Sequence, residues 1–289
     1  MGREDIDPGA DVANSFPNWR NEVLTWSIYP CQSGKLKFSF GYDTLKDMNE
    51  NLKPHDINQF PHDEGLVVFG ISMSKISNTQ RAENYFSYLE EFLRKIVKTD
   101  GIGAIILYSD YLYMHTANDT PQALRAKYVE SMLQHKNSFL NVLKKRRDLI
   151  PKAYTFLTWG QLLLNSREFT TYFSEIKKMY RDDQELQEYV KIDSGDKEVN
   201  ENQANFILEE SLVLYLIAKG KFSFPNDYIQ HREKWILNCY PGKPLMTEGY
   251  LYQKNIFEFK NPDNIYENSY YDLESKLLFD LSKHQFKDF

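Results

Sequence analysis

Cysteine is scarce in this chain, which has only Cys31 and Cys239 among its 289 residues. Their separation excludes the paired spacing of a zinc site, and the six histidines never fall into a ligand spacing with cysteines or carboxylates. We therefore expect no metal ion. Two isolated thiols are typical of a reducing compartment, so the sequence predicts a cytoplasmic protein.

Long apolar runs are also missing. No segment is apolar for long enough to span a membrane, and the first 19 residues lack the apolar core of a secretion signal. The chain contains no G-x-x-x-x-G-K-[ST] loop, and Gly101-Ile102-Gly103 precedes an apolar run instead of following one. We therefore expect neither a membrane partner nor a glycine-rich loop that binds phosphate.

Positive charge is in deficit, with 35 lysines and arginines against 41 aspartates and glutamates and a net charge of −6. The segment 120–147 is the exception, because its only acidic residue is Glu130. Its basic residues are Arg125, Lys127, Lys136, Lys144, Lys145, Arg146 and Arg147. Such a stripe is typical of a surface that meets a phosphate backbone, although a solvated face with cations at a helix C-terminus has the same pattern. The contrast with the acidic remainder favours nucleic acid.

Apolar and aromatic side chains are abundant, at 42% and 15% of the residues, which is enough for a large folded core. The run Leu66–Ser72 has four consecutive apolar residues before Gly70 and predicts a strand buried on both faces, as in a parallel sheet. A helical pattern over 79–98 and a second apolar run, Gly103–Tyr108, follow and predict a parallel pair of strands. We expect Gly70 to admit a close neighbour, and Ser72 to lie at the carboxyl edge of the sheet, where ligands bind.

The remaining patterns predict the other elements. Strands are expected over 35–42, 153–159 and 235–240, and helices over 120–147, 160–164, 167–180, 184–190 and 203–218. A hairpin over 250–259 and a final helix over 271–283 are expected after Pro241-Gly242. The predicted organisation is a flexible N-terminal arm over 1–20, a single α/β domain over 21–245 and a C-terminal extension over 246–289 that packs on it.

Two adjacent carboxylates, Glu209 and Glu210, lie inside the otherwise apolar helix 203–218. A carboxylate that faces a core needs partners. Because neighbouring positions lie about 100° apart around a helix axis, we expect one of the two to point inward and the other outward.

Five short features stand in a fixed order along the chain. They are Gly70-Ile71-Ser72; a strand ending at Asp110 before the basic helix; Leu157-Thr158-Trp159 leading to Tyr172 and Tyr180; Leu208-Glu209-Glu210 before an apolar run; and Tyr240-Pro241-Gly242. In this order they resemble the tRNA-dependent cyclodipeptide synthases over about residues 66–245. The Tyr240-Pro241 pair is similar to the Tyr-Pro branch of that family. The extent to which this sequence diverges from other members is similar to that of a fungal branch that uses arginine as one substrate.

This resemblance implies a Rossmann-like α/β fold, similar to the catalytic domains of class I aminoacyl-tRNA synthetases. It implies an aminoacyltransferase that makes a cyclic dipeptide (a 2,5-diketopiperazine) from two aminoacyl-tRNAs, through a seryl aminoacyl-enzyme. By position, Ser72 is similar to the nucleophile, Glu210 to the carboxylate that holds the α-amino group, and Tyr240 to the tyrosine that moves protons during cyclisation. The basic residues of 120–147 correspond to the surface that meets tRNA. The residues implied to border the substrate are Gly70, Phe206, Glu209 and Pro241.

Aminoacyl esters are already activated, so the resemblance implies no cofactor, and we expect a monomer. Backbone N–H groups after Ser72 are expected to stabilise an oxyanion. Family members usually carry a tyrosine where this chain has Phe206, so a register in which Glu209 is the functional carboxylate stays open. The alternative functions are a non-catalytic tRNA-binding module and a class I synthetase-like protein.

Overall fold

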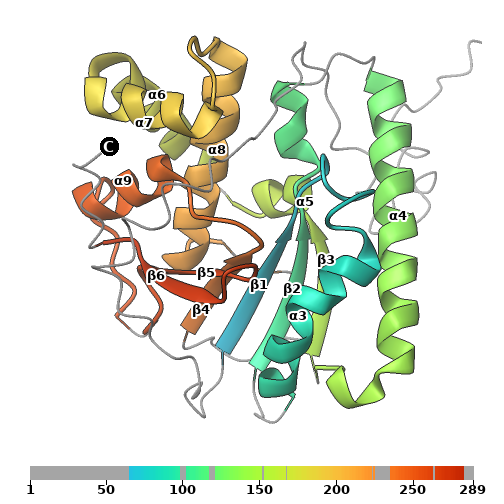
Figure 1. Cartoon of the computed structure of the whole chain (residues 1–289). Coiled ribbons are helices and arrows are strands. Elements are labelled where there is room, and N and C mark those ends of the chain that lie inside the picture. The colour runs from blue at the N-terminus through green and yellow to red at the C-terminus, as the bar shows by residue number, and fades with distance from the viewer. Residues whose placement is uncertain are drawn as a thin grey trace, which may run out of the picture.

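The structure is a computed structural model of the whole chain (Figure 1). It describes residues 65–97, 102–116, 121–151, 153–166, 168–222, 224, 235–262 and 264–282. The predicted arm over 1–20 and the predicted strand over 35–42 lie outside these residues. Within the described ranges, no helix is long and apolar enough to cross a membrane.

Six strands form one sheet in the order β3-β2-β1-β4-β5-β6. Their bounds are Gly65–Ile71 (β1), Ile102–Tyr108 (β2), Ala153–Thr158 (β3), Trp235–Tyr240 (β4), Ser269–Asp272 (β5) and Leu277–Asp280 (β6). Strands β1 to β5 are parallel and β6 is antiparallel to β5. The predicted parallel pairing of the first two strands is confirmed, with Val67 opposite Ala104. The predicted α/β class with a parallel sheet is confirmed with it.

Helices cover both faces of the sheet (Figure 1). They are α3 (Ala82–Ile96), the 3-10 helix η2 (Tyr111–His115), α4 (Pro121–Lys145), the 3-10 helix η3 (Arg147–Leu149), α5 (Trp159–Leu164), α6 (Phe169–Asp182), α7 (Gln184–Ser194), α8 (Glu201–Ala218) and α9 (Met246–Lys254). Val67 and Phe69 of β1 pack in the core beneath α3 and α4, whereas Leu66 and Val68 pack on the side of α8. Successive side chains of a strand point to opposite faces, so β1 contributes to both cores.

Helix α8 is apolar around its whole circumference, which is typical of an interior helix. It begins at a capping box formed by Asn200 and Gln203, and it contacts α6, α7, α9, η2 and β4. One of the two adjacent glutamates points into the core, as expected, because Glu209 is 2% exposed. Glu210 is half-buried, and its side chain borders a cavity instead of bulk solvent.

The order in which the chain adds strands to the sheet reverses between β1 and β4. The chain adds β2 and then β3 on one side of β1, and it returns to place β4 on the other side. In open α/β sheets this switch point leaves a crevice outside the carboxyl ends of the two strands, where ligands bind. Ser72 follows β1 directly and Tyr240 ends β4, so both residues lie at this crevice.

The C-terminal segment differs from the prediction in two places. Helix α9 forms where the hairpin over 250–259 was expected, because Asp193 accepts hydrogen bonds from the Met246 N–H (2.9 Å) and the Thr247 N–H (2.7 Å) and so caps the helix from a distant part of the chain. A β5–β6 hairpin forms where the final helix was expected. Its turn is held by Asp272, whose Oδ1 accepts from the Glu274 N–H at 2.8 Å.

Candidate active site

A cavity of about 640 Å³ opens at the switch point between β1 and β4. Six residues expected at the site border it: Gly70, Ser72, Phe206, Glu210, Tyr240 and Pro241. They come from β1, the loop after it, α8, β4 and the turn after β4. The fold therefore brings together residues that are up to 171 positions apart in the sequence, from Gly70 to Pro241.

Ser72 lies in the loop after β1 and is only 6% exposed. Its backbone N–H donates to the Gln80 Oε1 at 2.7 Å, which folds the loop 72–80 back on itself. Its Oγ lies 2.9 Å from the Ser74 Oγ and makes a hydrogen bond with the Tyr113 hydroxyl. The serine hydroxyl is therefore held in a fixed network of hydroxyl groups.

Two of the backbone N–H groups after Ser72, which were expected to stabilise an oxyanion, are already hydrogen-bonded within the fold. The Met73 N–H donates to the Ser109 Oγ at 3.3 Å, and the Lys75 N–H donates to the Ser72 carbonyl at 3.1 Å. Helix α3 begins only at Ala82, after a series of turns, so its first N–H groups lie ten residues along the chain from the serine. The Met73 and Lys75 donors therefore serve the folding of the loop, and an oxyanion site made by the N–H groups after Ser72 stays a prediction.

Tyr113 is a site residue that the sequence analysis missed. It lies in η2, and its hydroxyl contacts the Oγ atoms of Ser72 and Ser74, the latter at 2.9 Å. Its ring meets the ring of Phe206 edge to face, with centroids 5.1 Å apart. A phenol thus reaches the serine from η2, beside the position on α8 where this chain has phenylalanine. Its place just after the carboxyl end of β2 is the signal that could have revealed it.

Tyr240 packs directly against Gly70. A Cβ atom at Gly70 would lie 3.2 Å from the Tyr240 Cδ2, so the close approach expected at this glycine is confirmed. The Lys75 ammonium lies 5.2 Å from the centroid of the same ring. Burial raises the pKa of the Tyr240 hydroxyl and so does Glu210, while the neighbouring Gln80 and Ser72 side chains act in the opposite direction. The phenol is therefore protonated at neutral pH.

Glu210 presents a carboxyl group to the cavity from α8. Burial raises its pKa to about 7, the Lys75 ammonium lowers it, and Asp193 and Glu209 raise it. Near neutral pH the group therefore exchanges between a neutral acid and a carboxylate. A cation that enters the cavity favours the ionised form, so the site is suited to bind an ammonium group.

Glu209 faces a different part of the protein. Its Oε1 accepts a hydrogen bond from the Trp159 indole N–H at 2.9 Å, and its Oε2 lies 2.8 Å from the His115 Nε2. It does not border the cavity, although the resemblance had allowed it to contact substrate. Of the two glutamates, only Glu210 lies where it can meet a ligand of this cavity.

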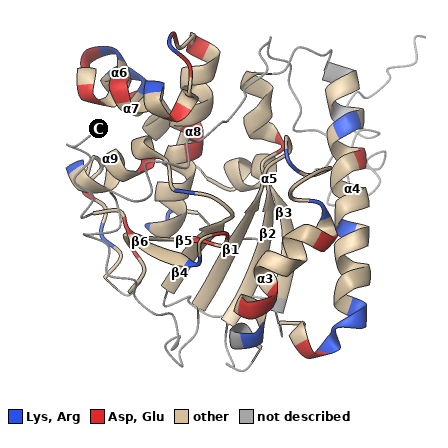
Figure 2. Cartoon of the chain, in the orientation of Figure 1, with Lys and Arg blue, Asp and Glu red and all other residues tan. Residues whose placement is uncertain are grey.

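The basic residues of α4 form a separate surface, visible as blue bands along that helix (Figure 2). Lys127, Lys144, Lys145 and Arg147 are exposed. Arg146 instead pairs with Glu90 at 2.9 Å, and the Lys136 ammonium lies over the Phe156 ring at 5.1 Å from its centroid. The exposed cations can meet a phosphate backbone, whereas Arg146 also ties α4 to α3.

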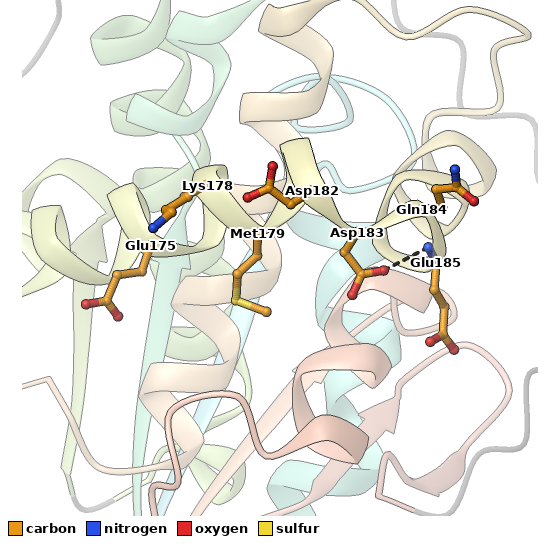
Figure 3. A pocket seen from close by; sticks show the side chains of 7 residues that line it. All are labelled: Glu175, Lys178, Met179, Asp182, Asp183, Gln184 and Glu185. Atoms are coloured by element: carbon orange, nitrogen blue, oxygen red, sulfur yellow. Dashed lines mark hydrogen bonds between the residues drawn. The ribbon is translucent and has the colours of Figure 1, made fainter.

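A second hollow, of about 750 Å³, lies along α6 and the start of α7 (Figure 3). Four of its lining side chains are carboxylates and one is a lysine: Glu175, Asp182, Asp183, Glu185 and Lys178. Asp183 caps α7 through the Glu185 N–H at 2.8 Å. Excess negative charge disfavours a phosphate ligand, and none of the predicted site residues lies here.

Comparison with known proteins gives similarity of structure alone. No family model and no curated protein matches the chain. The structure is similar to a cyclodipeptide synthase from Bacillus thermoamylovorans, with a TM-score of 0.42 and 14% identity over 70% of this chain and 86% of that one. It is similar to a cyclodipeptide synthase from Streptomyces noursei, with a TM-score of 0.40 and 12% identity over 61% of this chain and 82% of that one.

The structure is also similar to a tyrosyl-tRNA synthetase from Archaeoglobus fulgidus that was solved with L-tyrosine. The TM-score is 0.41 and the identity 13%, over 83% of this chain and 61% of that one. At these values the likenesses concern the α/β fold, and no assignment of function rests on them.

Proposed function

We propose that this chain is a tRNA-dependent cyclodipeptide synthase, an aminoacyltransferase that forms a cyclic dipeptide through an aminoacyl ester on Ser72. The observation that carries the proposal is the meeting of Ser72, Glu210 and Tyr240 in one cavity at the switch point of the sheet. The sequence resemblance implies roles for the same three residues, which come from three separate parts of the chain.

In the first step the Ser72 Oγ attacks the ester carbonyl of an aminoacyl-tRNA. A new ester bond forms to the serine, the bond to the tRNA ribose oxygen breaks, and the serine proton passes to that oxygen. A serine hydroxyl is a weak nucleophile without a proton acceptor. The Tyr113 hydroxyl is in direct contact with it and can pass the proton on through the hydroxyl network.

Glu210 holds the α-ammonium of the bound aminoacyl group. Its pKa of about 7 lets it ionise when that cation arrives, and a charge-assisted hydrogen bond fixes the carbonyl near Ser72. Tyr240, which is protonated and lies over Gly70, is placed to transfer protons when the second amide bond closes the ring. Before closure, the amino group of the seryl ester attacks the ester carbonyl of the second aminoacyl-tRNA, so the first amide bond forms and the second tRNA leaves with the proton. Ring closure then forms the second amide bond and breaks the Ser72 ester, which releases the serine hydroxyl. Two ester bonds are thus exchanged for two amide bonds, and no cofactor is consumed.

Two charged tRNAs supply the substrate, and we assign their contact to the exposed cations of α4, Lys144, Lys145 and Arg147. These residues lie at the C-terminal end of α4 and in η3. Arg146 is engaged by Glu90 and is a weaker candidate. A cytoplasmic location would give the protein access to charged tRNA.

The test of the reaction is acylation of Ser72. Wild-type protein incubated with tRNA that carries a radiolabelled amino acid should retain label after denaturation and release a cyclic dipeptide detectable by mass spectrometry. Ser72→Ala should lose both signals, while Ser77→Ala, which changes an exposed serine of the same loop, should keep them. Label retained on Ser72→Ala would contradict the assignment. Binding of charged tRNA without any product would identify a non-catalytic tRNA-binding module.

The tRNA surface is tested by its salt dependence. The triple variant Lys144→Ala, Lys145→Ala, Arg147→Ala should bind tRNA more weakly, and the slope of log K against log salt should become shallower by about two to three because fewer counterions are released. A matched triple variant at exposed lysines elsewhere, Lys178, Lys197 and Lys260, should leave the slope unchanged. If the two triple variants have equal slopes of log K against log salt, the basic residues of α4 form a solvated face and do not bind tRNA.

A further inference from the structure

The side chain of Gln80 has an unused hydrogen-bond donor in the wall of the cavity that holds Ser72. Gln80 lies just before α3 and is 1% exposed. Its Oε1 accepts a hydrogen bond from the Ser72 N–H at 2.7 Å, whereas its Nε2 has no hydrogen-bond partner among the residues that the structure describes. A buried donor without an acceptor costs free energy, so this group is suited to a ligand that supplies an acceptor.

The orientation of the Gln80 amide is fixed by its contact with Ser72. A backbone N–H can only donate, so the amide atom that faces the Ser72 N–H has to be the oxygen and not the nitrogen. The Nε2 is bonded to the same carbon atom as the Oε1, and it is therefore held beside the loop that carries the serine.

The backbone of Gln80 is held from α4 by His135. The His135 Nε2 lies 3.0 Å from the Gln80 carbonyl oxygen, and the His135 Nδ1 lies 3.0 Å from the Tyr108 hydroxyl. Burial lowers the pKa of His135 to about 4, so the imidazole is neutral near pH 7 and carries one N–H. Because a carbonyl oxygen only accepts, that N–H is at Nε2 and donates to Gln80. The amide is thus mounted on a fixed backbone.

Backbone donors around the serine are engaged within the fold. The N–H groups of Ser72, Met73 and Lys75 each donate to another group of the protein. The Gln80 Nε2 is therefore a donor beside Ser72 that the loop does not use for its own folding.

The Gln80 side chain also lies close to the reacting groups. Burial and Glu210 raise the pKa of the Tyr240 hydroxyl, whereas the side chains of Gln80 and Ser72 lower it. All four residues border the same cavity. The Gln80 amide and the Ser72 side chain therefore approach one and the same hydroxyl group.

We propose that Gln80 is a further catalytic residue, whose Nε2 donates a hydrogen bond to the carbonyl oxygen of the aminoacyl ester that Ser72 attacks. Attack turns that oxygen into the oxyanion of a tetrahedral intermediate, which collapses when the ribose oxygen leaves with the serine proton. A preorganised donor stabilises such a charge most strongly where water is excluded, and Gln80 is buried before the substrate arrives. The same carbonyl is attacked again at ring closure, so the donor acts in both steps. The assignment rests on the proposed function for the identity of the ester.

The test replaces the amide by a carboxyl group of the same shape. Gln80→Glu keeps an oxygen that can accept from the Ser72 N–H and loses the N–H donor. Slightly above neutral pH it should acylate Ser72 from aminoacyl-tRNA about a hundred- to thousandfold more slowly than the wild type in a single turnover. Gln161→Glu is the matched control, because the Gln161 Oε1 also accepts a backbone N–H, that of Thr158 at 3.0 Å, and it should acylate at the wild-type rate.

The pH profile separates a donor from a residue that only shapes the loop. Burial raises the pKa of a carboxyl group, and the protonated form has an O–H that can donate. The acylation rate of Gln80→Glu relative to the wild type should therefore rise as the pH is lowered through neutrality. A wild-type acylation rate in Gln80→Glu at every pH would overturn the assignment, even if release of the cyclic dipeptide is slow. A reduced rate whose ratio to the wild type is the same at every pH would overturn it too.

Gln80→Met is a second variant that introduces no buried carboxyl group, and thermal unfolding establishes that each variant is folded. Its acylation is measured with p-nitrophenyl acetate and with the thiono analogue, in which sulfur, a weaker acceptor, replaces the carbonyl oxygen. The signal is the burst of p-nitrophenol that Ser72→Ala lacks. The preference of the wild type for the oxygen ester should shrink about tenfold in Gln80→Met, whereas loss of a residue that only holds the loop would slow both esters alike. An unchanged preference would overturn the assignment.

The proposed function and the role of Gln80 can fail separately. If the wild type accepts no aminoacyl group from any charged tRNA but gives the burst that depends on Ser72, the proposed function is wrong and the pair of esters still decides the role of Gln80. If neither reaction acylates Ser72, both are wrong.

Discussion

The carboxylates on the two sides of helix α8 differ in their hydrogen-bond partners. On the side of η2 and α5, Glu209 is fully engaged by Trp159 and His115. On the side of the cavity, Glu210 has its pKa raised to about 7, and Glu248 of α9 has no hydrogen-bond partner among the residues that the structure describes. Glu209 and Glu248 are buried and Glu210 is half-buried, yet of the three only Glu209 has both carboxylate oxygens hydrogen-bonded within the described part of the chain.

A carboxylate with hydrogen-bond partners in the fold has a structural role, whereas one without them at a cavity can bind a ligand. The pair formed by Glu209 joins η2, α5 and α8, three elements that have to stay together for Tyr113 and Trp159 to keep their places. Within the part of the chain that the structure describes, Glu210 joins no elements through a hydrogen bond of its own. Its interactions with Lys75, Asp193 and Glu209 are electrostatic, and it borders open space.

The sharpest test replaces each of the two adjacent glutamates by glutamine in a separate variant. Glu210→Gln should lower product formation by about ten- to thousandfold, because it removes the charge that holds the substrate ammonium. Glu209→Gln should leave the rate per folded molecule within about threefold, and should instead lower the free energy of unfolding by about 1–2 kcal/mol. Product yield and chemical denaturation of both variants measure these quantities.

The opposite effects of the two variants on product formation would contradict the roles assigned to Glu209 and Glu210. If Glu209→Gln is inactive and Glu210→Gln is active, Glu209 is the functional carboxylate and the register of the resemblance shifts by one residue. If both variants make product at the wild-type rate, α8 does not hold the substrate amine.

Removal of the Tyr113 hydroxyl, which contacts the Ser72 Oγ, should have the next largest effect. Tyr113→Phe should slow acylation of Ser72 by about tenfold, since it removes one hydrogen bond to the nucleophile and leaves the ring packed on Phe206. Adding Phe206→Tyr to this variant places a phenol on the neighbouring ring and should restore part of the rate.

Single-turnover acylation with labelled aminoacyl-tRNA measures this effect. Tyr172→Phe, which removes a hydroxyl bonded to Glu168 on exposed α6, serves as the control and should acylate at the wild-type rate. A wild-type rate in Tyr113→Phe would show that the hydroxyl network takes no part in activating Ser72.

A further prediction concerns stability as a function of pH. Burial raises the pKa of Glu210 from 4.5 to about 7, so between these values the folded state binds a proton that the unfolded state has released. The free energy of unfolding should therefore fall as pH rises through this window, by at most about 3 kcal/mol from this group. Glu210→Gln should lack that fall, and the difference between the two denaturation curves isolates it from Asp110, Asp193 and Glu248, whose pKa values burial also raises. Parallel curves would show that Glu210 ionises freely in the fold.

Much of the sheet could be predicted from the sequence. Leu66–Phe69 and the apolar run that ends at Tyr108 are unbroken, and a strand buried on both faces needs that pattern whatever surrounds it. The close contact at Gly70 followed from the same stretch. By contrast, the aromatic run over 250–259 and the segment after Tyr270 have local patterns that suit either a strand or a helix. The distant Asp193 caps the helix that forms in the first, and pairing of β5 with β4 accompanies the hairpin that forms in the second.

Ser72 could be nominated from its place after a buried strand, which is a local property of the chain. The roles of Glu210 and Tyr240 came from the family resemblance, because the helix pattern alone did not choose between the two glutamates. The order of the strands, which brings the three residues together, depends on long-range pairing of β1 with β2 and with β4. Gln80, Tyr113 and Glu248 could not be nominated in this way. What distinguishes them is the partner they contact or lack, and a sequence does not record partners.

The sequence by itself determined an α/β chain with parallel strands, a basic helix and a serine at a strand end, because hydrophobic period, charge and turn residues act over a few neighbouring positions. Only the tertiary structure decided which buried carboxylate is satisfied and which faces an open cavity. The physical reason is that the cost of a buried charge depends on the donors within hydrogen-bond distance, and for Glu209 and Glu248 the presence or absence of those donors is fixed by residues far away in the chain.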